Sequence, residues 1–320
     1  MSKQKTQITE YRNYYLPYDF PVFLLSGDYW KISSIKSNNL HFHNCLEIGI
    51  CHSESGYMDF NKIKAPLSFK AGDVTCIPRN IPHTTWSEAG TESHWSYIYV
   101  DVGEFMKLFL PNTSAQNFDL SVAAYKNYKY IITRDEYPDI YPLTISIVNE
   151  LEGQKQNFRT CAAGLLISLI VKLCRIQSAG GEAITSSENP PENAMVLSAV
   201  LDYIDEHYAE SIDIDYLAEI SHLSPTHFRR LFHNIIGTSP LDFLNKKRID
   251  KACDLLVSTE DPIVNISEAV GFKSLTSFNR HFAEQKKTTP RTYRHETLSK
   301  REQLNKTEIR RYKGWLYPEK

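Results

Sequence analysis

The sequence contains few of the residues that mark unusual classes of protein. Its 320 residues include 13 glycines, 15 prolines and 6 cysteines, too few for a collagen-like chain, a proline-rich low-complexity chain or a disulfide scaffold. The cysteines are irregularly spaced and form no CxxC pair. Neither a zinc knuckle nor a thioredoxin-like motif is therefore indicated, and we expect reduced, mostly structural thiols.

Long apolar runs are also missing. The longest strongly apolar stretch, residues 164–171, is much shorter than the roughly 20 residues of a bilayer-spanning helix. The polar start MSKQKTQITEYRN lacks the apolar core of a signal peptide. A composition of 42% hydrophobic and 23% charged residues still permits ordinary buried cores. The sequence thus predicts a cytoplasmic globular protein with no membrane partner.

The net charge of −2 conceals an uneven distribution. Residues 1–211 have a formal net charge of −7, whereas residues 212–320 have a formal net charge of +5. A basic C-terminal third is typical of nucleic-acid binding, although many enzymes also have a basic face.

The two halves differ in pattern. From residue 20 to about 100, short runs rich in Ile, Val, Tyr and Phe are separated by Gly, Pro and Asn, which predicts an antiparallel sandwich or barrel. Residues 139–152 and 159–177 have the length and periodicity of helices. The second is apolar nearly all round, so a dimer interface or plain core packing must bury more than one side.

We expect an α+β protein of two domains. Residues 1–178 would form an N-terminal antiparallel β-barrel with helices, used for effector binding and dimerisation. Residues 179–193, rich in Gly, Ser, Pro and Asn, read as a flexible linker. Residues 194–298 would form an all-α domain, followed by a charged tail at 299–320. Within the all-α domain the expected helices are 195–208, 214–221, 225–236, 240–257, 264–270, 275–286 and 290–297.

The helical region repeats internally. At an offset of 50 residues the matched positions are Phe228 with Phe278, Arg230 with Arg280, Phe232 with Phe282, Pro240 with Pro290 and Phe243 with Tyr293. Before the turn the offset is 49, pairing Leu217 with Ile266 and Leu223 with Phe272. This pattern predicts two copies of one helix-turn-helix unit, joined by a helix.

The second helix of each copy carries polar side chains opposite its apolar face. In copy one the outward set is Thr226, Arg229, Arg230 and His233, and in copy two it is Thr276, Asn279 and Arg280. Such residues can read base edges in the major groove, Arg at guanine and Asn at adenine. One such helix alone is usually a solvated face, but the duplication favours DNA binding. The joining helix would span about 25 Å, enough to reach neighbouring grooves roughly 34 Å apart.

These residues resemble a known family. The stretches IDIDYLAEISHLSPTHFRRLFHNIIGTSPLDFLNKKRIDKACDLL and ISEAVGFKSLTSFNRHFAEQKKTTPRTYR are similar to the DNA-binding domain of the AraC/XylS bacterial transcription regulators. The resemblance implies DNA contacts at Thr226, Arg229, Arg230, Leu275, Thr276, Asn279 and Arg280. Two positions depart from the family pattern: His222 replaces a turn glycine and Ser267 replaces an alanine. Both predict slightly strained turns.

The N-terminal half contains a histidine-rich constellation. His41, His43 and Glu47 lie in HFHNCLE, and GDVTCIPRNIPH ends at His83. Positions 41, 43 and 47 have the same parity, so on one strand they would share a face that a barrel turns inward. Three imidazoles and a carboxylate suit a divalent metal such as Zn, Fe, Mn or Ni.

Both segments resemble the two motifs of the cupin barrel. Because AraC/XylS regulators commonly carry a cupin-like sensing barrel at this position, the resemblance implies a site for a small, sugar-like effector. The predicted effector-binding residues are His41, His43, Glu47, His83 and Trp95, with Trp86, Tyr97 and Tyr99 as further aromatic side chains able to stack on a sugar. The alternative is a metal held by His41, His43, Glu47 and His83.

The sequence therefore predicts a transcription regulator without catalytic activity or a required cofactor. Its expected partners are double-stranded DNA, a small-molecule effector, RNA polymerase and a second copy of the chain that dimerises through residues 159–177. Effector binding would change how the dimer presents its DNA-binding domains. The rival interpretations are a cupin-type metal-dependent enzyme or metal sensor fused to a DNA-binding domain, and an interaction module whose arginines bind an acidic partner.

Overall fold

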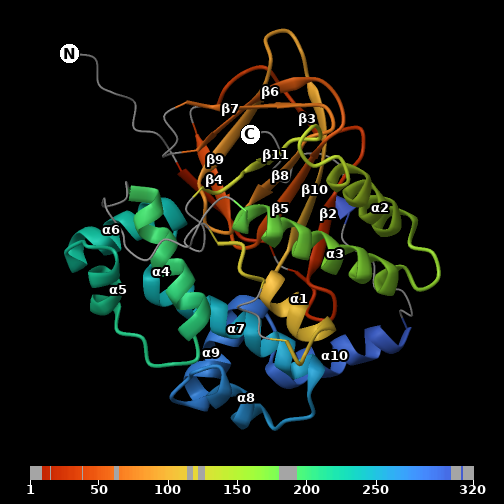
Figure 1. The fold of residues 1–320 in the computed structure, drawn as a ribbon. Helices are drawn as coiled ribbons and strands as arrows, with labels where there is room; N and C mark the ends of the chain where they lie inside the picture. Colours follow the sequence, from red (N-terminus) through yellow and green to blue (C-terminus); the bar gives the residue numbers. More distant parts are fainter. Residues whose placement is uncertain are drawn as a thin grey trace. The chain divides into compact units, whose positions relative to one another are not determined.

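The computed structural model describes residues 9–14, 16–37, 39–60, 65–113, 118–121, 127–179, 193–303 and 311–312. The chain divides into two compact units, the first formed by Met1–Pro190 with Ile309–Lys320 and the second by Pro191–Glu308 (Figure 1). Of the predicted linker, only Ala179 and Asn193 fall within the described residues, and most of the predicted tail lies outside them. The predicted domain boundaries stay predictions.

Unit 1 contains two β-sheets. The five-stranded sheet has the order β1 (Thr9–Arg12), β4 (Leu40–His43), β9 (His83–Ser87), β6 (Ser55–Phe60) and β7 (Leu67–Lys70). The second has the order β11 (Ile131–Ile132), β8 (Val74–Ile77), β5 (Leu46–Cys51), β10 (Ser93–Val100), β2 (Val22–Leu25) and β12 (Arg311–Tyr312), with β3 (Lys31–Ile32) also pairing with β10. Most pairs are antiparallel, whereas β1 with β4 and β12 with β2 are parallel.

The predicted antiparallel barrel is not closed in the residues that the structure describes, because no ladder joins the two sheets. The chain passes from one sheet to the other at Asn44–Cys45. Strands β4 and β5 flank this two-residue connection but pair with different neighbours instead of with each other. The α+β class is confirmed, with a β-rich N-terminal region and a helical C-terminal region.

The second sheet is covered on both faces, so its central strand β5 is buried at every position. Alternate side chains such as Ile48 and Ile50 pack in one cluster with the helices, while Cys51 on the other face joins Trp95 and Tyr99. The helices that share this core are α1 (Val102–Phe109), α2 (Ile140–Gly153) and α3 (Phe158–Ser178). In Figure 1, α3 crosses in front of the sheet with α2 beside it.

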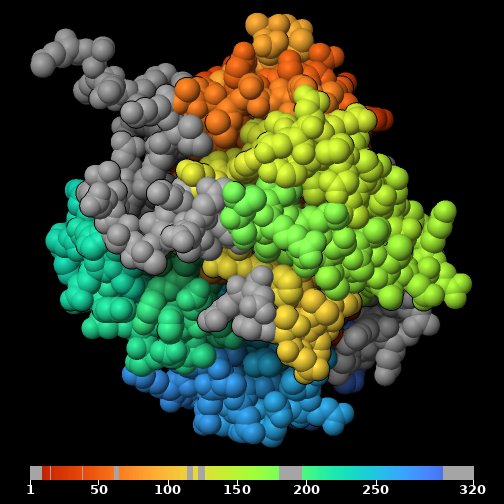
Figure 2. Space-filling view, viewed as in Figure 1, coloured from red at the N-terminus to blue at the C-terminus, as the bar shows by residue number. Residues whose placement is uncertain are grey.

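Helix α3 is long and apolar enough to cross a membrane by length and composition alone. A core helix of a soluble protein passes the same test. Seven of its apolar residues belong to the core of unit 1, namely Ala162, Ala163, Leu166, Leu169, Ile170, Leu173 and Ile176. Its other side is exposed at Cys161, Gly164, Ser168 and Arg175, and the space-filling view shows this helix beside α2 at the surface (Figure 2). Core packing therefore covers one side of α3, and the predicted dimer contact would require the other.

Unit 2 is entirely helical in its described residues. Its helices are α4 (Asn193–His207), α5 (Ile214–Ile220), α6 (Pro225–Ile236), α7 (Pro240–Ser258), α8 (Ile263–Ala269), α9 (Leu275–Lys286) and α10 (Pro290–Gln303). All seven expected helices are confirmed. The side chains of Ser224, Ser239 and Ser274 accept hydrogen bonds from the backbone N–H three residues later, which fixes where α6, α7 and α9 begin.

The two halves of unit 2 repeat in geometry as well as in sequence. His222 has φ 54°, and at the matched position, 49 residues later, Gly271 has φ 91°. A non-glycine residue in this left-handed region costs about 1–2 kcal/mol. The Ser267 hydroxyl, at the position of Ala218 in the first half, is buried without a hydrogen-bond partner among the described residues. Both departures from the family pattern thus fall at locally unfavourable positions, as predicted.

Candidate functional sites

The first candidate site is formed by the exposed faces of α6 and α9. Phe228, Leu231 and Phe232 turn the apolar side of α6 inward, and Phe278 and Phe282 do the same for α9. The opposite sides carry all seven predicted DNA contacts in exposed positions, namely Thr226, Arg229, Arg230, Leu275, Thr276, Asn279 and Arg280. Both faces are thus available to a ligand, while the role of each residue stays a prediction.

Two of these arginines have partners within unit 2. Arg229 Nη2 lies 2.8 Å from the Asp215 carboxylate of α5, and both side chains are exposed. Arg280 Nη2 lies 3.2 Å from His281 Nε2. Exposed ion pairs contribute at most about 1 kcal/mol, so Arg229 can exchange Asp215 for another anion at little cost.

The second candidate site is the histidine cluster of unit 1. His41 and His43 lie on β4, and His83 begins β9, where it pairs with His41 across the strands. Glu47 reaches the cluster from β5 of the other sheet. The prediction that positions 41, 43 and 47 share one strand is therefore wrong, because the chain turns at residues 44–45. The four side chains nevertheless converge.

The distances within the cluster are short. Ligand atoms from His41, Glu47 and His83 lie within 4.8 Å of one another. His43 Nε2 is 3.3 Å from Glu47 Oε2, and His83 Nε2 is 3.6 Å from Glu47 Oε1. His43, Glu47 and His83 are almost fully buried. A carboxylate between imidazoles is thus held away from water.

The hydrogen bonds fix which imidazole nitrogens carry protons. His43 Nδ1 donates to the Cys45 carbonyl at 2.8 Å, and His83 Nδ1 donates to the Ile81 carbonyl at 2.9 Å. Nε2 of each ring is then the atom directed toward the carboxylate, a lone-pair acceptor in the neutral imidazole and a donor to Glu47 in the charged one. His43 Nε2 makes no hydrogen bond of acceptable geometry with any described residue. Such acceptors repel one another unless a proton or a cation lies between them.

The electrostatic environment keeps Glu47 ionised. Burial by itself raises the pKa of Glu47, but the imidazoles of His43 and His83 outweigh it and hold that pKa well below its usual range. Burial, together with the nearby His83, places the pKa of His41 well below its usual value. At neutral pH the site therefore presents an anion and at least one neutral imidazole, which is a suitable donor set for a metal ion.

Aromatic side chains pack around the cluster. The Tyr99 hydroxyl donates to Glu47 Oε2 at 2.7 Å, and the ring of Tyr14 lies 4.3 Å from that of Tyr99. Asn44 holds Tyr14 by two hydrogen bonds to its backbone. The sequence interpretation did not include Tyr14. It lies about 30 residues before the histidines, and only the aromatic density of YRNYYLPY could have drawn attention to it.

Trp95 is completely buried, stacked on Tyr97, and its indole N–H donates to Ser93 Oγ at 2.8 Å. Trp86 contacts Tyr57 and the Lys36 ammonium group, away from the histidines. The structure thus places Tyr97 and Trp95 in the interior and separates Trp86 from the cluster. An effector contact at Trp95 stays a prediction.

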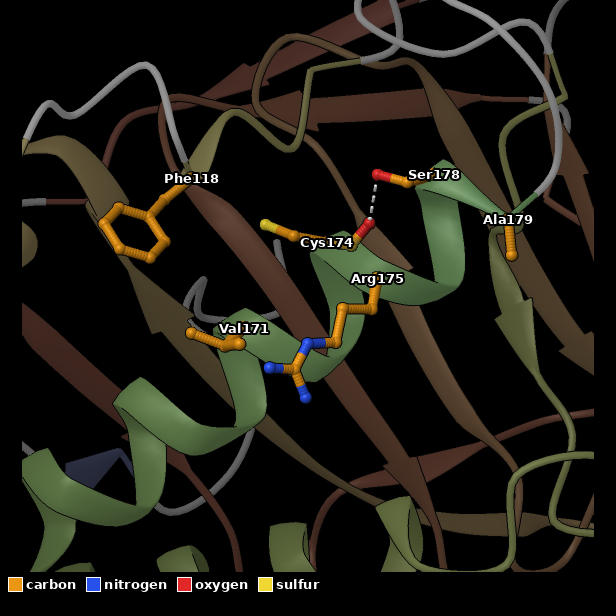
Figure 3. A pocket seen from close by; sticks show the side chains of 6 residues that line it. All are labelled: Phe118, Val171, Cys174, Arg175, Ser178 and Ala179. Atoms are coloured by element: carbon orange, nitrogen blue, oxygen red, sulfur yellow. Dashed lines mark hydrogen bonds between the residues drawn. The ribbon is translucent and has the colours of Figure 1, made fainter.

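An open depression lies elsewhere on unit 1 (Figure 3). It has a volume of about 490 Å³ and is lined by Phe118 and by Val171, Cys174, Arg175, Ser178 and Ala179 at the end of α3. None of these residues belongs to the histidine cluster, and no motif in the sequence marks them as a site.

A family model matches within unit 2. Residues 217–296 match a family model described as a helix-turn-helix domain. The regulatory protein SoxS of Escherichia coli is 31% identical over 100 residues, which cover 31% of this chain and 94% of SoxS. The chain belongs to the AraC family of transcription regulators.

Longer members of the AraC family match over part of their length. The uncharacterized HTH-type transcriptional regulator YobQ of Bacillus subtilis is 34% identical over 101 residues, covering 32% of this chain and 42% of YobQ. The arabinose operon regulatory protein of Escherichia coli is 31% identical over 158 residues, covering 49% of this chain and 51% of that protein. The matched segment thus spans about half or less of these relatives, and the family assignment concerns the C-terminal unit.

Proposed function

We propose that the chain regulates transcription by reading double-stranded DNA with α6 and α9, the recognition helices of two helix-turn-helix units. The observation that carries this proposal is the duplicated exposed face, on which arginine and small polar residues occupy matched positions above a buried phenylalanine pair. The positive balance of residues 212–320 supports it, because cationic groups attract the phosphate backbone. An acidic protein partner would not require two helix-turn-helix units with polar residues at matched positions.

Replacing Arg230 or Arg280 by Ala should weaken binding to the preferred duplex by about 1–3 kcal/mol and relax the base preference at one position, because a bidentate contact to a base is lost. The measurement is titration of the full-length protein with duplexes selected from a random library, at several salt concentrations. Lys107→Ala, an exposed cation on α1, is the charge-matched control and should leave both quantities unchanged.

An equal loss on all duplexes would instead mark these arginines as phosphate contacts. Wild-type protein that binds no selected duplex even at low salt would overturn DNA binding altogether. In the expected case the logarithm of the affinity falls steeply with the logarithm of the salt concentration, because bound phosphates release counterions.

We further propose that the regulator is a homodimer formed through α3, and that unit 1 passes an effector signal to the DNA-binding units and so to RNA polymerase. The exposed side of α3 supports the dimer, since Gly164 and Ser168 would let two helices approach closely. Replacing Ser168 by Arg, which places charge on this side, should shift full-length protein toward monomer in sedimentation velocity. A wild-type monomer at tens of micromolar would contradict the dimer.

The effector would bind at His41, His43, Glu47 and His83, with Trp95, which stacks on Tyr97, as a further contact. A small, sugar-like molecule is one candidate, since hydroxyls can donate to the carboxylate and the imidazoles. A divalent metal ion is the second candidate, favoured by the Nε2 atoms of His43 and His83 that face Glu47. Their Nδ1 atoms donate to backbone carbonyls, an arrangement that commonly orients metal-binding histidines. A bound cation would supply the positive charge that these acceptors share.

A further inference from the structure

One buried arginine of α7 holds the connection between the first two helices of unit 2. Arg248 is 8% exposed, and its Nε and Nη2 donate to the carbonyl oxygens of Tyr208 and Glu210, each at 2.7 Å. A buried guanidinium is costly unless its hydrogen bonds are made. Here two of its donors are used on one short stretch of backbone, residues 208–210, which links α4 to α5.

The same stretch of backbone touches the second half of the repeat. A Cβ atom on Gly271 would lie 2.5 Å from the Ala209 carbonyl oxygen, so the backbones of the two halves are in direct contact. Tyr208 packs against the core of the second half. The Arg248 guanidinium is itself 5.7 Å from the centre of the Phe272 ring. One side chain therefore joins the 208–210 connection of the first half to the turn of the second.

This turn is directly coupled to the second recognition helix. The Phe272 ring packs on Phe278 of α9 at 5.4 Å. Asn245, one turn before Arg248 on α7, adds a contact between its Nδ2 and His281 Nε2 of α9 at 3.5 Å. Helix α7 begins four residues after α6 ends. The contacts that Arg248 and Asn245 of α7 make with the Phe272 turn and with α9, here called the junction, therefore affect the position of α6 relative to α9.

A second arginine provides an internal comparison. Arg294 of α10 donates to the Leu256 and Asp261 carbonyl oxygens at 2.9 and 2.7 Å, binding the end of α7 and its connection to α8. Arg294 thus makes the same kind of hydrogen bonds as Arg248, with one guanidinium holding two backbone carbonyls, although by the repeat offset it occupies the position of Leu244. Of the two, only Arg248 lies over an aromatic ring within the part of the chain that the structure describes.

We propose that Arg248 is a specificity-determining positioning residue: by clamping residues 208–210 against the Phe272 turn, it sets the separation of α6 and α9 and so the spacing between the two DNA sub-sites that one chain accepts. The inference rests on the proposed function, in which both helices enter the major groove. One added base pair displaces the second sub-site by about 3.4 Å and rotates it by roughly 35°. A rigid junction cannot follow that change, whereas a loosened junction can.

The test measures spacing preference with full-length protein. Duplexes are selected with the wild-type protein from a random library, and the spacer between the two sub-sites is then shortened or lengthened by one base pair. Wild-type protein should lose at least about 10-fold in affinity on either altered spacer. Arg248→Met should bind the selected duplex more weakly and reduce this discrimination to about 3-fold or less. Arg294→Met, the matched control, should keep the wild-type discrimination even if its thermal stability falls.

Two further variants cover a failure of Arg248→Met to fold. Arg248→Lys keeps the charge but cannot bridge both carbonyls in the planar geometry of a guanidinium, and Phe272→Leu removes the ring while keeping an apolar side chain. Either variant, if folded by circular dichroism, should show the reduced discrimination. Wild-type discrimination in every folded variant would overturn the proposal, as would an equal loss in Arg294→Met. Wild-type protein that binds no duplex would instead refute the proposed function itself.

Discussion

Replacing Glu47 by Gln should abolish the thermal stabilisation that a divalent transition metal gives to the full-length protein. At a free metal concentration of 100 times Kd, binding to the folded state adds about 2.7 kcal/mol to the free energy of unfolding. The Gln side chain keeps an acceptor for the Tyr99 hydroxyl and nearly the same shape. It lacks the negative charge that would hold the proposed cation beside the imidazoles, so the stabilisation should disappear while the fold is retained.

The measurement compares melting temperatures with and without Zn²⁺, Ni²⁺, Mn²⁺ or Fe²⁺, together with the metal content of protein purified without chelator. His94→Gln is the matched control, because this histidine lies on β10 outside the cluster and binds the Gly27 carbonyl. Stabilisation that survives in Glu47→Gln would place the metal elsewhere and refute the metal site. If no metal stabilises wild-type protein but a monosaccharide does, and His83→Gln removes that effect, the effector at this cluster is a small polar molecule.

Gly271→Ala should lower the free energy of unfolding of unit 2 by roughly 3–4 kcal/mol. About 1–2 kcal/mol comes from the left-handed backbone, which an L side chain adopts only under strain. The remainder comes from overlap of the new methyl group with the Ala209 carbonyl, because neither backbone can move without disturbing the core, and overpacking costs about 1–3 kcal/mol. Denaturant unfolding of the full-length protein, followed by helical circular dichroism, measures the change.

Gly237→Ala separates the two contributions. Gly237 ends α6 with φ 82°, and nothing lies within 4 Å of the position of an added Cβ atom. This variant should show only the backbone cost of about 1–2 kcal/mol. Equal losses in the two variants would show that overlap of the added methyl group with the Ala209 carbonyl costs nothing.

The helices of unit 2 could be predicted because their signals are local. Ser224 and Ser274 cap α6 and α9, and Pro225 and Pro240 suit the first turn of a helix, so these boundaries follow from neighbouring residues in the sequence. The exposed faces of α6 and α9 followed from helical periodicity, which is also local. The family resemblance then indicated which of the exposed residues would contact DNA.

The remaining features depend on contacts between distant residues. Strand pairing in unit 1 could not be deduced, because short apolar runs do not specify their neighbours or whether a sheet closes. Glu47 was associated with the histidines on a parity argument that assumed one strand, although it reaches them from the opposite sheet. Arg248 gave no signal at all, since an arginine on an amphipathic helix is ordinarily exposed, and its partners are carbonyl groups about 40 residues away.

The ion pair between Arg229 and Asp215 affects how salt-dependent binding is interpreted. In the unbound protein the Arg229 charge already has a counterion, and it is a carboxylate of the same chain. If Arg229 contacts a phosphate, as proposed, a cation would leave the DNA, but Asp215 would lose its partner beside a polyanion and would attract a cation in turn. The number of cations released on binding would therefore be smaller than the number of arginine–phosphate contacts. A salt titration would then report fewer phosphates than α6 actually contacts.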